Sequence, residues 1–200
     1  MAVPHWFVGF DSLMQMIGSI IALAIAYYAF KAFRLTRERT MFFLHFSFVL
    51  LAVGLFTDGI VTFPVAAITR LSPLMIPSYY VRMFTEIIAY GLLLYAYLRR
   101  TKQVLTESIA SVAMVGYNPL LEVVVFFLIA YIAIQCAMNY GVRRDKNALL
   151  VFIGFLLLAV SHLLSVFPPV FPLLFVVSHF SQLLGFMALL AMLVRVAEIA

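Results

Sequence analysis

Six apolar segments, each close to the length needed to cross a lipid bilayer, dominate this chain of 200 residues. A spanning helix needs about 20 mainly apolar residues, and its backbone must satisfy its own hydrogen bonds within the lipid. Composition agrees, because 66% of the residues are hydrophobic and only 10% are charged. We therefore predict an all-α integral membrane protein. Its expected spans are Ser12–Phe30, Met41–Phe63, Tyr79–Leu98, Leu120–Tyr140, Ala148–Phe167 and Leu173–Val194.

The first part of the chain recurs in the second part without a gap. When Val8–Asp58 is shifted by 107 positions it lies on Val115–Ser165, with many identical or similar residues. A proline-rich turn follows the repeated stretch in each half, and the next spans align at a shift of 96, which places Glu86 on Gln182. Duplicated apolar units of this kind build many channels and transporters. The sequence therefore predicts two fused three-helix repeats.

The relative orientation of the repeats has two interpretations. Three spans is an odd number, so a repeat of three that follows directly must insert upside down relative to the first. We prefer this six-helix bundle of inverted repeats, 1–98 and 115–200, joined by an amphipathic linker over 99–114 on the inner surface. The alternative has parallel repeats and a seventh span between Gln103 and Pro119. That alternative places nearly all loop cations on one side, as the positive-inside rule favours.

Ionisable side chains inside the spans need a partner or water, because an isolated charge in the membrane is costly. Arg82 lies four residues before Glu86, so the two share a helix face as an ion pair or as a tuned proton- or cation-binding group. Inverted repeats would also bring Glu86 and Gln182 together at the bilayer centre. The predicted substrate or ion pathway consists of Asp58, Arg82, Glu86, His162, His179 and Gln182.

Three histidines lie inside the predicted spans, and we expect His45, His162 and His179 all in the inner half of the bilayer. His162 and His179 should face each other across the antiparallel hairpin of the last two spans. Two imidazoles can ligate the iron of a b-type haem, and His45 with His162 is the better separated pair for it. The other interpretations are hydrogen bonds between helices and a proton relay. Glu122 and its repeat mate Gln15 open spans four and one, where we interpret Asn118 and Asp11 as helix N-caps and Glu122 as a first-turn carboxylate that suits the helix dipole.

The sequence contains none of the common motifs of nucleotide hydrolysis, zinc proteolysis, serine hydrolysis or thiol redox chemistry, which argues against an enzyme. The favoured function is a small transporter or channel with a polar midplane site, coupled to protons or another cation. The alternatives are a membrane subunit of an electron-transfer complex and a signalling or assembly module. We expect no cofactor, with haem b as the exception to test.

The expected surroundings follow from the same composition. The lipid bilayer is the main expected partner, followed by a second copy of the chain or other membrane subunits. Nucleic acid is not expected, because the basic residues other than Arg82 lie outside the predicted spans and form no basic face. The expected location is the plasma membrane of a prokaryote.

Overall fold

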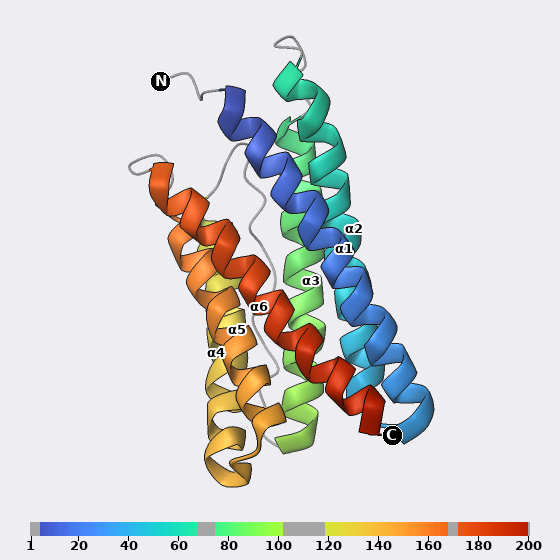
Figure 1. The fold of residues 1–200 in the computed structure, drawn as a ribbon. Helices are drawn as coiled ribbons and strands as arrows, with labels where there is room; N and C mark the ends of the chain where they lie inside the picture. Colours follow the sequence, from blue (N-terminus) through green and yellow to red (C-terminus); the bar gives the residue numbers. More distant parts are fainter. Residues whose placement is uncertain (1–4, 68–74, 102–118, 168–171, 200) are drawn as a thin grey trace.

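The computed structural model describes residues 5–67, 75–101, 119–167 and 172–199. These residues form α1 (His5–Thr36), α2 (Arg39–Ala67), α3 (Met75–Thr101), α4 (Pro119–Arg143), α5 (Lys146–Ser165) and α6 (Pro172–Ile199). Each of the six is long and apolar enough to cross a membrane. The predicted all-α bundle is therefore confirmed, and its helices follow the predicted spans (Figure 1).

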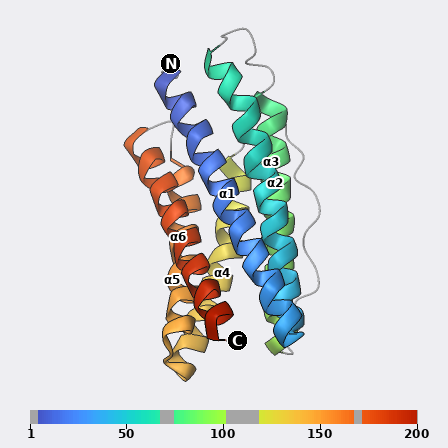
Figure 2. The same cartoon turned by 45° about the vertical axis from the view of Figure 1, so that its right-hand side comes forward.

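The helices form a ring in chain order. Each packs on its neighbours in the sequence, and α6 closes the ring against α1 (Figures 1 and 2). The backbones of other pairs of described helices do not approach one another closely, so side chains fill the centre, where Phe48 of α2 meets Phe186 of α6. The largest of these buried side chains are aromatic: Tyr90, Phe48, Phe155 and Phe186.

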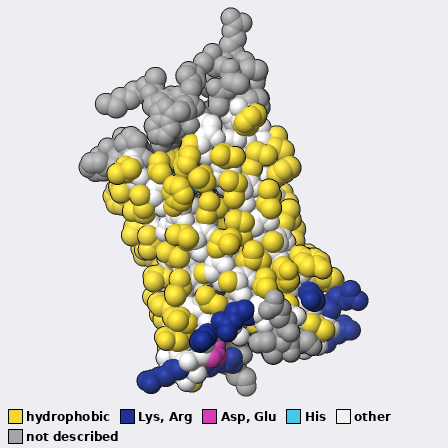
Figure 3. Space-filling model, viewed as in Figure 1, with side chains coloured by type: hydrophobic (Ala, Val, Ile, Leu, Met, Phe, Trp, Pro, Cys, Tyr) yellow, Lys and Arg dark blue, Asp and Glu magenta, His cyan; other side chains and the backbone are white. Residues whose placement is uncertain are grey.

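Large apolar side chains cover the outside of the bundle (Figure 3). Ile20 is 68% exposed, Phe127 65% and Leu173 73%. An apolar surface that surrounds the whole bundle is not stable in water, whereas lipid chains can cover it. The protein is thus an integral membrane protein.

The directions of the helices contradict the inverted arrangement. α1, α3, α4 and α6 begin at one end of the bundle, and α2 and α5 finish there (Figure 1). The ion pair of Arg82 with Glu122 joins the first half of α3 to the first turn of α4, so these two helices are parallel. Because α4 also runs parallel to α1, the preferred inverted topology is wrong. The parallel direction is the one that the alternative predicts.

The linker predicted over 99–114 lies for the most part outside the described residues. Thr101 ends α3 and Pro119 begins α4, and these two residues lie at opposite ends of the bundle (Figure 1). The linker itself falls on residues that the structure does not describe, so this part of the prediction is not tested. The rule that three spans force an inversion assumes a connection that stays on one side of the membrane.

Basic side chains gather at the end of the bundle where α1 and α4 finish (Figure 3). We call this the basic end and the opposite one the cluster end. The positive-inside rule assigns the basic end to the cytoplasm. The described basic residues there are Lys31, Arg34, Arg37, Arg39, Arg143, Arg144, Lys146 and Arg195.

Candidate functional site

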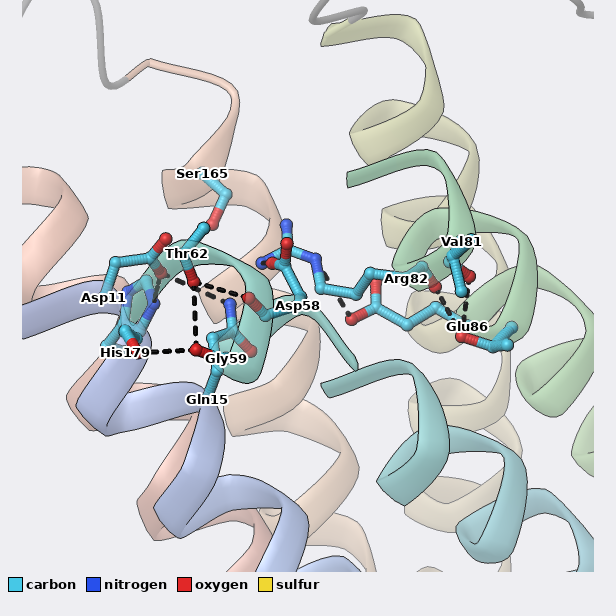
Figure 4. Close-up of polar contacts among 12 residues, drawn as sticks. Asp11, Gln15, Asp58, Gly59, Thr62, Val81, Arg82, Glu86, Ser165 and His179 are labelled. Atoms are coloured by element: carbon cyan, nitrogen blue, oxygen red, sulfur yellow. Dashed lines mark hydrogen bonds and ion pairs between the residues drawn. The ribbon is translucent and has the colours of Figure 1, made fainter. Parts of the chain in front are cut away.

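Five ionisable side chains from four helices meet between α2, α3, α4 and α5, toward the cluster end. Figure 4 shows three of them, Asp58, Arg82 and Glu86. We call this group the Arg82 cluster. Arg82 is at its centre, with its guanidinium nitrogens 3.4 Å from Asp58, 3.3 Å from Glu122 and 3.8 Å from Glu86. His162 extends the cluster, because its Nδ1 lies 2.9 Å from the second oxygen of Glu122.

Local sequence explains why these side chains meet. Glu86 follows Arg82 by one helical turn, so both point from the same face of α3. Asp58 reaches Arg82 because α2 and α3 cross closely at Gly54, where any side chain would collide with Thr85. Small residues permit such close crossings in membrane bundles.

Along α3, the exposure of the cluster's side chains falls with depth. The Arg82 side chain is 14% exposed and Asp58 6%, whereas Glu86 and Glu122 are each 2% exposed. Glu86 lies one turn further along α3 than Arg82, about 6 Å deeper in the bundle. The cluster is therefore most accessible at the cluster end and extends from there toward the middle of α3.

A second pair, Asp11 with His179, joins α1 to α6 at the same end (Figure 4). His179 Nε2 lies 2.8 Å from Asp11 Oδ1, and its Nδ1 lies 3.0 Å from the carbonyl oxygen of Phe175. A neutral imidazole has one N–H, so it can donate to one of these two oxygens.

The Arg82 cluster is different, because it contains more negative than positive groups. Asp58, Glu86 and Glu122 can each carry a negative charge, whereas Arg82 is the one group in the cluster that is always positive. A neutral His162 satisfies Glu122 by donating from Nδ1. With all three carboxyl groups ionised, the cluster would carry two uncompensated negative charges at membrane depth. Charges there are expensive unless paired, so the cluster favours the binding of protons or of a cation.

Sequence reasoning missed the importance of Glu122 and Asp11. Glu122 does lie in the first turn of α4, as predicted, but it also bridges Arg82 and His162. Asp11 is not an N-cap, because α1 begins at His5, six residues earlier. The sequence did contain one indication of their importance. Both carboxylates lie in apolar spans with no basic residue one helical turn away, so each needs a partner from another helix.

The histidines are not arranged as predicted. His162 turns to α4 and His179 to α1, so they do not face each other across the α5–α6 hairpin. Between α5 and α6 at this level, the described contact is instead a hydrogen bond of 2.7 Å between Ser165 and Ser178. Each imidazole instead contacts a carboxylate on a helix outside the hairpin.

His45 lies far from the other two histidines, so the expectation of one shared half of the bilayer is wrong. It is near the start of α2, at the basic end, and donates from Nδ1 to the carbonyl oxygen of Ala26 at 2.9 Å. Asp58 lies 13 residues further along α2, about 20 Å away. The preferred haem pair of His45 and His162 is therefore not brought together. The part of the chain that the structure describes also holds no group of three or more potential metal ligands.

Gln182 does not face Glu86. It lies on α6 and is half-buried, and α3 and α6 are not neighbours among the described helices. The expected meeting at the bilayer centre depended on inverted three-helix units, whereas α4, α5 and α6 run in the directions of α1, α2 and α3. Of the six predicted pathway residues, the cluster joins Asp58, Arg82, Glu86 and His162.

Comparisons with known proteins add no name to this arrangement. No protein family, curated protein or solved structure matches the chain. The class that the fold defines is a multi-pass helical membrane protein with a buried ionic cluster toward one end.

Proposed function

We propose that the protein is a small membrane transporter that binds protons in the Arg82 cluster. The observation that carries the proposal is the balance of buried charge. Three carboxyl groups surround one guanidinium, and His162 adds a fourth site at which a proton can bind. Ionisable groups inside membrane spans commonly mark ion pathways and proton relays. A purely structural ion pair would need one carboxylate for Arg82, not three.

We also propose that the two three-helix units are copies of one ancestral unit. Arg37 and Arg144, which are 107 residues apart, both adopt the left-handed conformation, with φ of 58° and 51°. Each donates its backbone N–H at 2.8 Å to a carbonyl four residues earlier, Phe33 and Tyr140, which are also 107 residues apart. Few side chains favour this conformation, so its occurrence at matched positions supports a common origin.

Polar contacts at matched positions support the duplication and show how the halves differ. The 107 and 96 shifts place Asp58 on Ser165 and Arg82 on Ser178. The ion pair of the first half thus corresponds to a hydroxyl–hydroxyl hydrogen bond in the second. Parallel repeats related by an axis along the membrane normal occur in known transporter folds. In this chain Asp58, Arg82 and Glu86 of the cluster come from the first half, and Glu122 and His162 come from the second.

The exposure gradient supports entry from the cluster end, which the positive-inside rule places away from the cytoplasm. Asp11 and Arg82 are the most exposed members of the two polar groups, at 18% and 14%. A proton that enters there would meet the Asp11–His179 pair and the edge of the Arg82 cluster before reaching Glu86.

Proton movement in liposomes tests the proposal. Purified protein is reconstituted with a pH-sensitive dye inside, and a pH gradient with a potassium–valinomycin clamp drives protons inward. We expect faster acidification than in protein-free liposomes. Glu122→Gln should abolish the difference, because it removes the carboxylate that joins Arg82 to His162.

Glu38→Gln is the matched control. It makes the same chemical change at an exposed position in the turn between α1 and α2, at the basic end. Its proton movement should equal that of the wild type. Wild-type liposomes that acidify no faster than empty ones would refute proton transport, and equal rates in wild type and Glu122→Gln would remove the cluster from it.

A further inference from the structure

Three polar atoms deep in the bundle have no hydrogen-bond partner within the part of the chain that the structure describes. They are Glu86 Oε2, the Tyr90 hydroxyl and His162 Nε2. Their residues are almost completely buried, at 1%, 0% and 4% exposure. A buried polar atom without a partner costs about 1–3 kcal/mol, so three such atoms together call for an explanation.

These atoms belong to residues that adjoin one another. Tyr90 follows Glu86 by one helical turn on the same face of α3. The Tyr90 and His162 rings pack edge to face, with centroids 5.9 Å apart at 82°. Glu86 and His162 are also close enough to interact electrostatically. The three residues therefore surround one point between α3 and α5, deeper in the bundle than Arg82.

We infer that Glu86, Tyr90 and His162 form an internal proton-binding site, which His162 connects to Glu122. A carboxylate oxygen, a phenol and an imidazole nitrogen can all share a bound proton through hydrogen bonds. A proton also needs no room of its own, unlike a larger ligand. This inference rests on the proposed function and specifies where in the cluster the proton is held.

His162 has the connections that a relay requires. Its Nδ1 is bound to Glu122, and its Nε2 belongs to the unpartnered group. When Glu122 is protonated, it gives its proton to Nδ1 while Nε2 releases one to Glu86. One N–H bond forms and one breaks, the imidazole stays neutral, and Glu86 gains the proton that Glu122 loses.

The surrounding charges favour this step. Besides His162, the charged neighbours of Glu86 are Arg82 on its own helix, Glu122 on α4 and Asp58 on α2. The two carboxylates repel a negative charge on Glu86, and a bound proton removes that repulsion. Arg82 partly offsets the repulsion, but its Nε is 3.8 Å from Glu86 Oε1 and has no hydrogen-bond partner among the described residues. Tyr90 supplies a hydroxyl beside Glu86 that can donate to either form of the carboxyl group.

Infrared difference spectroscopy of the full chain in lipid nanodiscs tests the inference without relying on transport. Acid-minus-neutral spectra should contain the C=O stretch of a protonated carboxyl group that Glu86→Gln removes. Tyr90→Phe should shift the frequency of that band, because the phenol no longer donates to it. The Tyr90→Phe protein should fold like the wild type, because the Tyr90 hydroxyl has no hydrogen-bond partner among the described residues.

The relay is tested by the rate at which the same carboxyl band shifts after transfer to D₂O. His162→Gln should slow this exchange by roughly 10²-fold, the range that a positioned proton-transfer group contributes. His45→Gln is the matched control, because His45 lies at the other end of the bundle, and its exchange should equal that of the wild type. A band that persists in Glu86→Gln overturns the site, and unchanged exchange in His162→Gln overturns the relay. Normal infrared results in a protein that moves no protons across liposomes would support the site and refute transport alone.

Discussion

Replacing Arg82 by methionine should destabilise the protein more than any other single charge removal. Methionine keeps the length and apolar stem of the side chain, so the main loss is the positive charge. Three carboxylates lie within 3.3–3.8 Å of that charge. Removing one partner of a buried ion pair costs about 3–5 kcal/mol. We expect a loss of that size in the free energy of unfolding at neutral pH.

The loss should depend on pH in a defined direction. Without Arg82, the folded protein holds three carboxyl groups together with no permanent counter-charge, so it binds protons more tightly than the unfolded chain. Stability then falls as pH rises, because the folded state is the one with more bound protons. The difference between Arg82→Met and wild type should therefore shrink as the pH is lowered through the carboxyl range.

The single cysteine provides the assay. Cys136 is buried at 2% exposure on α4, so a thiol-reactive fluorescent dye labels it only after unfolding. Denaturant titrations at several pH values give the free energy for variant and wild type under identical conditions. Arg34→Met, at an exposed position near the end of α1, is the matched control and should change stability by less than about 0.5 kcal/mol.

Two results would refute the reasoning. One is an Arg82→Met protein within about 1 kcal/mol of wild type, a loss too small for a broken buried ion pair. The other is a full loss that does not vary with pH, which would point to packing rather than to uncompensated charge. Adding Glu122→Gln to Arg82→Met should recover part of the loss, because the double variant has one carboxylate fewer to compensate.

Three further predictions concern topology and local geometry. Tags should report the C-terminus in the cytoplasm and the N-terminus outside, and an external C-terminal tag would contradict the assignment of the basic end. Gly154→Ala should lower stability by about 1–3 kcal/mol in the dye assay, because the added Cβ would lie 2.7 Å from Leu189 Cγ. Gly91→Ala is the control and should not lower stability, because a Cβ at Gly91 would meet open space. Stability should rise by about 0.5–1 kcal/mol in each of Arg37→Gly and Arg144→Gly, because glycine relieves the left-handed backbone strain at the cost of some chain entropy. A decrease in both variants would show that the arginine side chains matter more for stability than the backbone strain.

The helices could be predicted from sequence because each span is specified locally. Twenty apolar residues in lipid have few alternatives to a helix, and turns such as Arg37–Arg39 end one span and begin the next. The direction of α4 is not local in this sense. It depends on whether the segment between Thr101 and Pro119 crosses the membrane. That segment is short and polar for a span. The distribution of basic residues did indicate this direction, because they collect at one end only when α4 runs parallel to α1.

The site was predictable to the extent that it follows helical spacing. Arg82 and Glu86 are one turn apart on one helix. Asp58 lies in the last third of α2, the helix that precedes α3 in the chain. The contacts of Glu122 join residues 40 positions apart on separate helices, Arg82 and His162. Such pairs depend on which helices become neighbours, and an error in helix direction therefore removed Glu122 from the predicted site.

The ring of helices joins its two halves at two places, and the ionisable groups there differ in chemistry. At the α3–α4 junction, Arg82 holds Glu122 with a charge that no physiological pH removes. At the α6–α1 junction, His179 Nε2 lies 2.8 Å from Asp11 Oδ1, and even a neutral imidazole can donate its one N–H to that carboxylate. The same fold thus joins its halves by a permanent ion pair on one side and by an imidazole–carboxylate contact on the other. The uncompensated carboxylates lie next to the permanent ion pair, at the α3–α4 junction.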